Sequence, residues 1–100
     1  MTTTETTPRH EEQADASEKQ AILPPWSVIL HNDDHNDMLH VVQSLVKSVP
    51  NLGTPRATKI MLEAHNTGRA VVTTCPLELA ELYRDRLGTF GLTATIERAN

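Results

Sequence analysis

A short apolar run that ends at a cluster of amide and acidic side chains sets the first constraint on the fold. Residues 26–31, Trp-Ser-Val-Ile-Leu-His, predict a buried strand because large apolar and β-branched residues dominate. The run stops at Asn-Asp-Asp in positions 32–34, and Asn36 or Asp37 can cap a following helix. This tight turn would place hydrogen-bond acceptors beside apolar side chains. Such a turn would suit a ligand that carries a cation next to an apolar group. The alternative is a capped turn whose acidic side chains are merely solvated.

Chain length and composition restrict the class of protein. One hundred residues with a formal net charge of -4 make one small domain. The sequence shows neither an apolar run of membrane-spanning length nor a signal-peptide pattern, and its single cysteine, Cys75, agrees with a reducing compartment. We therefore expect a cytoplasmic protein without a membrane partner. Because basic residues form no cluster, we also expect no nucleic-acid partner.

The first 25 residues differ in composition from the rest. Threonine and charged residues dominate them, and Pro24-Pro25 stiffen the entry to the first strand. We expect a flexible N-terminal extension over residues 1–25 and one folded domain over residues 26–100. The extension is either an inert leader or an arm that reaches a partner.

Periodicity predicts three helices after the first strand. The first runs from about residue 37 to residue 49, where Pro50 ends it. Thr54, as a hydroxyl cap before Pro55, predicts the start of the second, which should stop at residues 66–68. Pro76 opens the third, which Gly88 ends. Its expected inward residues are Leu79, Ala80, Tyr83 and Leu87.

Two further strands complete the fold class. Residues 70–74 form a short β-branched run, and residues 92–97 alternate between apolar and polar side chains. The order is therefore β-α-α-β-α-β. We expect an α+β fold in which three helices pack on a small three-stranded antiparallel sheet, with the strand order left open.

The usual catalytic and metal-binding patterns are missing from the sequence. The histidines at 31, 35 and 40 and the nearby aspartates lack the spacing of zinc ligands. The glycines are scattered singly, and serine occurs in no nucleophile elbow. We therefore expect no metal, no cofactor and no enzymatic activity.

Helical spacing singles out His65, which lies outside the turn region, as a further candidate for the site. It lies four residues after Met61, on the apolar stripe of the second helix. It is either a core histidine with satisfied hydrogen bonds or a residue that faces the turn at 32–34 from the end of its helix.

Together, the turn at 32–34, Met38 with Val41-Val42, and the segment 57–71, Ala-Thr-Lys-Ile-Met-Leu-Glu-Ala-His-Asn-Thr-Gly-Arg-Ala-Val, resemble the ClpS family. The resemblance runs from residue 26 to about residue 99. It implies an adaptor that delivers substrates of the N-end rule to a Clp AAA+ unfoldase, ClpA-like or ClpC-like, and its ClpP peptidase. Such substrates carry an N-degron, which is a destabilising N-terminal residue.

The resemblance also implies roles for individual residues. Asn32, Asp33 and His65 match residues that bind the free α-amino group, and Asp34 matches a residue that shapes the turn or holds the peptide backbone. The resemblance implies a pocket for a bulky Leu, Phe, Tyr or Trp side chain, in which Met38 acts as a gate against Ile and Val. The matching pocket positions are Met38, Val41, Met61, Ala64 and Leu92.

The implied unfoldase-docking surface and some pocket positions depart from the family pattern. Glu78 matches a family acid, whereas Tyr83, followed by Arg84, stands where lysine is common. Residues 35–37 differ from the usual aromatic-Thr-Pro, and Ala64 replaces a common valine.

The main alternative to this function is a non-catalytic module that docks on the Clp unfoldase and modulates it without recognising N-degrons. A ribosomal-stalk-like binding module and an enzyme are weaker alternatives.

Overall fold

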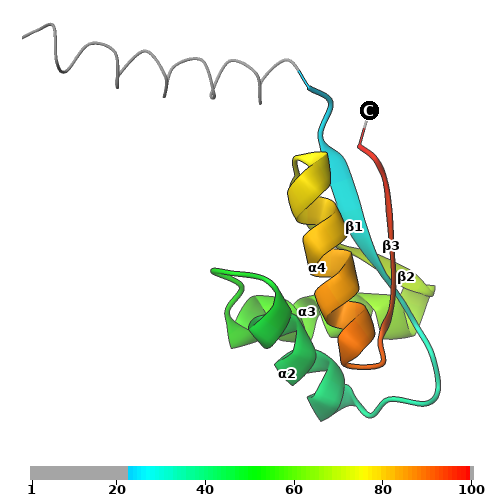
Figure 1. Ribbon diagram of the computed structural model, residues 1–100. Helices are drawn as coiled ribbons and strands as arrows, with labels where there is room; N and C mark the ends of the chain where they lie inside the picture. Colours follow the sequence, from blue (N-terminus) through cyan, green and yellow to red (C-terminus); the bar gives the residue numbers. More distant parts are fainter. Residues whose placement is uncertain (1–22, 100) are drawn as a thin grey trace, which may run out of the picture.

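The computed structural model describes residues 23–99, so nearly all of the expected N-terminal extension lies outside the described residues. The predicted order β-α-α-β-α-β is confirmed (Figure 1). No helix in the described part of the chain is both long and apolar enough to cross a membrane. The elements are β1 (Trp26–His31), α2 (Met38–Ser48), α3 (Thr54–Thr67), β2 (Arg69–Cys75), α4 (Leu77–Thr89) and β3 (Thr93–Arg98).

The first strand of the sequence is the central strand of the sheet. The strand order is β2-β1-β3, and β1 is antiparallel to both neighbours. Val28 pairs with Thr73 but Ile29 pairs with Val71, so β2 carries one extra residue at this point. The apolar composition of β1 fits this position, because a central strand is the one most enclosed by the rest of the fold.

The three helices lie on one face of the sheet. Helix α3 packs against β2, and α4 packs against β3 and β1 (Figure 1). Helix α2 packs against α3 and α4 and forms the outer layer. The predicted α+β arrangement is therefore confirmed.

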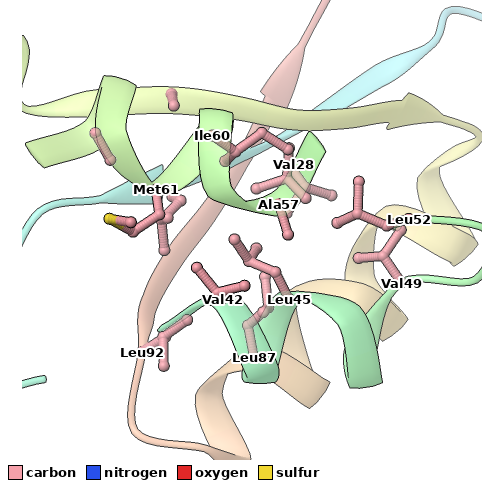
Figure 2. Packing of buried hydrophobic residues seen from close by; sticks show 14 of the residues in the cluster. Val28, Val42, Leu45, Val49, Leu52, Ala57, Ile60, Met61, Leu87 and Leu92 are labelled. Atoms are coloured by element: carbon pink, nitrogen blue, oxygen red, sulfur yellow. The ribbon is translucent and has the colours of Figure 1, made fainter. Parts of the chain in front are cut away.

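The core lies between the sheet and the helices. Each element contributes apolar side chains to it, with Val28 from β1, Leu45 from α2 and Leu87 from α4 fully buried. Met61 and Leu92 lie at one end of this cluster, away from Leu52 (Figure 2). That end is where the core meets the turn after β1.

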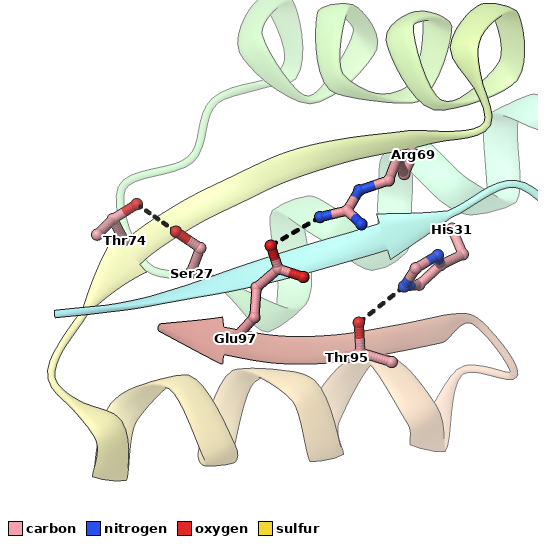
Figure 3. Close-up of polar contacts among 6 residues, drawn as sticks. All are labelled: Ser27, His31, Arg69, Thr74, Thr95 and Glu97. Carbon is pink, nitrogen blue, oxygen red and sulfur yellow. Dashed lines mark hydrogen bonds and ion pairs between the residues drawn. The ribbon is translucent and has the colours of Figure 1, made fainter. Parts of the chain in front are cut away.

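Side-chain contacts cross the face of the sheet that carries no helix. Ile29 is only 1% exposed although it points away from the helices. Arg69 on β2 and Glu97 on β3 form an ion pair of 2.9 Å that spans the central strand, and His31 and Thr95 are joined at 2.7 Å (Figure 3). These contacts explain how Ile29 is shielded on this face.

Three details of the predicted helices are wrong. Gly88 does not end α4, because it lies within the helix, which continues to Thr89. The N-cap of α3 is Gly53, not Thr54, because the helix already includes Thr54 and places Pro55 in its first turn. Leu79 is exposed and does not face inward, since Ala80, Tyr83 and Leu87 alone fill the inner side of α4. Asp37, one of two expected caps for α2, accepts a hydrogen bond from the His40 N–H at 2.8 Å.

Candidate functional site

A cavity of about 340 Å³ opens where the turn after β1 meets α2 and α3. Its size lies at the small end of the range typical of ligand pockets, about 300–1,000 Å³. All nine residues expected to contact an N-terminal residue line it, together with four others. The lining residues are Leu30, His31, Asn32, Asp33, Asp34, Asn36, Asp37, Met38, Val41, Met61, Ala64, His65 and Leu92.

Backbone pairing brings the end of α3 beside the turn. Helix α3 ends at Gly68, whose φ of 98° is a left-handed conformation that favours glycine. The chain then enters β2 antiparallel to β1, and the Asn32 N–H donates to the Gly68 carbonyl at 3.0 Å. Because His65 precedes Gly68 by less than one helical turn, it lines the same cavity as Asn32 and Asp33.

The turn itself is organised by one carboxylate. Asp33 Oδ1 accepts hydrogen bonds from the backbone N–H groups of His35 at 3.0 Å and Asn36 at 3.1 Å. The Asn36 side-chain amide adds contacts of 3.1 Å to Oδ1 and 3.2 Å to Oδ2. Since a carboxylate offers about four lone-pair sites, Oδ2 keeps acceptor capacity for a ligand.

The polar end of the cavity is open to solvent. Asn32, Asp34 and His65 are exposed and Asp33 is half-buried. The alternative that His65 is a core histidine is therefore wrong, because its side chain lies at the cavity and not among buried residues. An amide oxygen, a carboxylate and an imidazole nitrogen thus share one opening.

The apolar end of the cavity is continuous with the core. Ala64, only 2% exposed, forms part of its wall with the buried Met61 and Leu92. Val41 is half-buried, and Met38 stands at the rim with 45% of its surface exposed. The interpretation that Met38 is an ordinary core residue is therefore wrong, whereas Met61 and Leu92 belong to both core and cavity.

Four residues of the cavity wall were missing from the expected site. Leu30 and His31 line it from the end of β1, and Asn36 and Asp37 line it from the start of α2. The alternation along β1 places Leu30 on the helix side, so its position was accessible from the sequence. The contact of Asn36 with Gly91, 55 residues away, carries no local signal.

The expected unfoldase-docking residues lie on α4, which contributes no residue to this cavity. Glu78 is exposed in the first turn of α4, and Tyr83 packs partly against the core. Arg84 is half-buried and pairs with Asp85 at 3.1 Å. The same helix exposes three leucines, which are Leu77, Leu79 and Leu82.

Cys75 at the end of β2 is a free thiol, half-buried against the core. Burial raises the pKa of this thiol, which lowers the thiolate fraction at neutral pH. Over residues 23–99, no group of three or more His, Cys, Asp or Glu side chains is placed to hold a metal ion.

The fold and this cavity define a small α+β binding domain that offers acceptors for a cation beside an apolar wall. Comparison with known families identifies the family. Residues 22–95 match the family described as ATP-dependent Clp protease adaptor protein ClpS. The chain belongs to the ClpS family of Clp protease adaptors.

Relatives and a solved structure agree with this membership. The chain is 49% identical to a ClpS of Gloeobacter violaceus over 75% of this chain and 81% of the relative. It is 43% identical to a ClpS of Synechococcus elongatus over 86% of this chain and 90% of the relative. Agrobacterium tumefaciens ClpS2 bound to L-phenylalaninamide has a similar structure, with a TM-score of 0.71 and 26% identity over 75% of this chain and 96% of that chain.

Proposed function

We propose that this chain is an adaptor that binds the N-terminal residue of N-degron substrates and delivers them to a Clp AAA+ unfoldase-peptidase. The observation that supports this most directly is the cavity itself. It combines Asn32, Asp33 and His65 at a polar opening with an apolar wall behind them. A free N-terminal Leu, Phe, Tyr or Trp presents the matching pair of groups, an ammonium beside a bulky apolar side chain.

The ammonium would be recognised by its three N–H donors. Asn32, Asp33 and His65 supply an amide oxygen, a carboxylate oxygen and a neutral imidazole nitrogen as acceptors. Removing an ammonium from water without such partners costs several kcal/mol, so the acceptors decide whether the group enters. Asp33 also supplies the negative charge, which makes its bond to the ammonium the strongest of the set.

This recognition also explains which termini the site would reject. An acetylated terminus has one amide N–H and no positive charge. It would leave at least two acceptors at the opening without their donors, one of them charged. Sites that recognise a polar group through buried hydrogen-bond partners can prefer a ligand with this group over one that lacks it by up to about 10⁴-fold. Because the polar end of this cavity is partly open to solvent, we expect a smaller ratio here.

The first side chain would occupy the apolar end. Met61, Ala64 and Leu92 give it a wall without charged groups, and Val41 and Met38 close the side toward α2. The replacement of a common valine by Ala64 leaves more room at a wall residue that is otherwise buried. We place Asp34, which is exposed beside Asp33, against the backbone of the bound peptide.

The unfoldase would bind on α4, around Glu78, Tyr83 and Arg84. Three exposed leucines on this helix give the surface an apolar character that charged residues border. Because α4 contributes nothing to the cavity, a substrate and a Clp unfoldase of ClpA or ClpC type can be held at once. In this role the chain binds and delivers but catalyses no reaction. Its single free cysteine agrees with a cytoplasmic site of action.

Two substitutions at the polar opening test the proposal. Asp33→Ala and His65→Ala should each lower the affinity for a fluorescent peptide that begins with Phe by about tenfold or more, because a partner of the ammonium is lost. Fluorescence anisotropy measures the affinity, and circular dichroism checks the fold. Asn66→Ala is the matched control, since Asn66 follows His65 and does not line the cavity.

Unchanged affinity in both variants would refute the assignment of the ammonium site. The alternative, a module that docks on the Clp unfoldase and modulates it without N-degron recognition, predicts a different result. In that case, binding to the unfoldase would persist in every variant while the Phe peptide fails to bind the wild-type chain.

A further inference from the structure

Asn36, a cavity residue that the sequence did not mark as part of the site, links the turn after β1 to a distant loop. Its backbone N–H donates to Asp33 Oδ1 at 3.1 Å. Its side-chain amide lies 3.1 Å from Asp33 Oδ1, 3.2 Å from Asp33 Oδ2 and 3.0 Å from the Gly91 carbonyl. One short side chain therefore joins the carboxylate of the turn to the loop between α4 and β3.

Asn36 joins a residue of the polar opening to the loop that leads into the apolar wall. Asp33 lies at the polar opening, and Gly91 directly precedes Leu92 in the apolar wall. Gly91 has a φ of 84°, so its loop turns sharply before β3 begins. A side-chain amide has two N–H donors, which matches one bond to the carboxylate and one to the carbonyl.

We propose that Asn36 is a positioning residue for N-terminal recognition, which rests on the function proposed above. It holds the Asp33 carboxylate in one orientation, with Oδ2 left able to accept a bond from the ammonium of the substrate. A carboxylate that is fixed before binding loses less conformational freedom when the ammonium arrives. By its bond to Gly91, Asn36 also fixes the distance between the ammonium site and Leu92.

His40 provides a natural control for this role. The Nε2–H of His40 donates to the Phe90 carbonyl at 2.7 Å, one residue before the carbonyl that Asn36 binds. Both side chains thus attach the start of α2 to the same loop. Of the two, only Asn36 contacts Asp33. A change at His40 loosens the loop without touching the carboxylate.

The test compares two ligands that differ only in the α-amino group. L-phenylalaninamide carries it, and 3-phenylpropionamide has the same ring and amide without it. Affinities of the full chain for both are measured by NMR titration for the wild type, Asn36→Ala, Asn36→Ser and His40→Ala. Thermal unfolding of each variant reports the fold.

We expect Asn36→Ala to weaken phenylalaninamide binding by about tenfold and 3-phenylpropionamide binding by less than about twofold, because the loss concerns a bond to a charged group. Asn36→Ser keeps one donor and should recover part of the affinity for the amine. His40→Ala should change the affinity for both ligands by the same factor.

Three results would overturn the positioning role. They are an Asn36→Ala variant with wild-type affinity for phenylalaninamide, an equal loss for both ligands in that variant, and no recovery in a folded Asn36→Ser variant. Failure of the underlying function has a different signature, since the wild type itself would then bind the two ligands equally or not at all.

Discussion

In the proposed function, Met38 is the side chain that would select among N-terminal residues. It stands at the rim of the cavity with 45% of its surface exposed, and neighbouring Val41 is half-buried. Crowding at this rim would act on the Cβ of the bound residue, where Ile and Val are branched and Leu and Phe are not.

Met38→Ala should therefore admit peptides that begin with Ile or Val. Overpacking of this kind costs about 1–3 kcal/mol, so we expect their affinity to rise by about tenfold. A panel of peptides that differ only in the first residue measures the change, with the Leu peptide as the internal control. If the Ile and Val peptides gain nothing relative to Leu, Met38 is not a gate.

Ser48 at the end of α2 gives a prediction about stability. Its side chain is fully buried, and its hydroxyl has no hydrogen-bond partner among the described residues. An unsatisfied buried hydroxyl is costly and alanine is a better helix former, so Ser48→Ala should raise the free energy of unfolding by about 1 kcal/mol. Urea denaturation measures this change.

Ser44→Ala is the matched control for Ser48. Ser44 is equally buried on the same helix, but its hydroxyl donates to the His40 carbonyl at 2.7 Å. Removing the Ser44 hydroxyl should not raise the free energy of unfolding by a comparable amount. A loss of stability in Ser48→Ala that equals or exceeds the loss in Ser44→Ala would show that the Ser48 hydroxyl has a partner in solution.

Residues of the candidate site could be identified from the sequence to different degrees. Asn32 and Asp33 follow from the abrupt end of an apolar strand, and His65 follows from its place on the apolar stripe of the second helix. The family resemblance supplied the role that it implies for all three. The part played by Asn36 could not be predicted, because it depends on a contact with Gly91 that only the folded chain creates. Local patterns reveal which side chains stand at a turn, but not which distant carbonyl they reach.

At the scale of elements, the junction between α3 and β2 places His65. Gly68 has a φ of 98°, and its carbonyl accepts the bond from the Asn32 N–H. An alanine in this conformation costs about 1–2 kcal/mol. Gly68→Ala should therefore lower the free energy of unfolding by that amount and weaken binding of a Phe peptide as well.

Gly88→Ala is the control for Gly68. Gly88 lies within α4 without a positive φ, and an added Cβ there meets no atom within 4 Å. Helix propensity predicts that this change is neutral or stabilising by up to about 1 kcal/mol. Equal stability of the Gly68→Ala variant and the wild type in urea denaturation would contradict the proposed strain.

The elements themselves were largely predictable because periodicity reflects burial. The alternation in 92–97 and the helical spacing in α2 and α3 each correspond to a buried face. The sequence predicts that Leu79 faces inward, yet the inner side of α4 is filled by Ala80, Tyr83 and Leu87, and Leu79 is exposed. Pairing order was not predictable, since the crossovers permit several strand orders.

At the scale of the whole molecule, the fold separates two surfaces. The cavity is built from the end of β1, the following turn, α2, α3 and Leu92, whereas α4 presents charged and leucine side chains elsewhere. The predicted extension at residues 1–25 lies almost entirely outside the described residues. Because the residues that line the cavity belong to the described domain, we expect this domain to suffice for recognition of the N-terminal residue, so that a binding measurement alone tests it.

The most direct test is a calorimetric titration of the wild-type chain with a peptide that begins with a free Phe and with the same peptide acetylated at its N-terminus. We predict saturable binding of the free peptide and an affinity at least about 100-fold lower for its acetylated form, since both the charge and two donors are lost. Equal affinity for the two peptides would contradict recognition of the α-amino group.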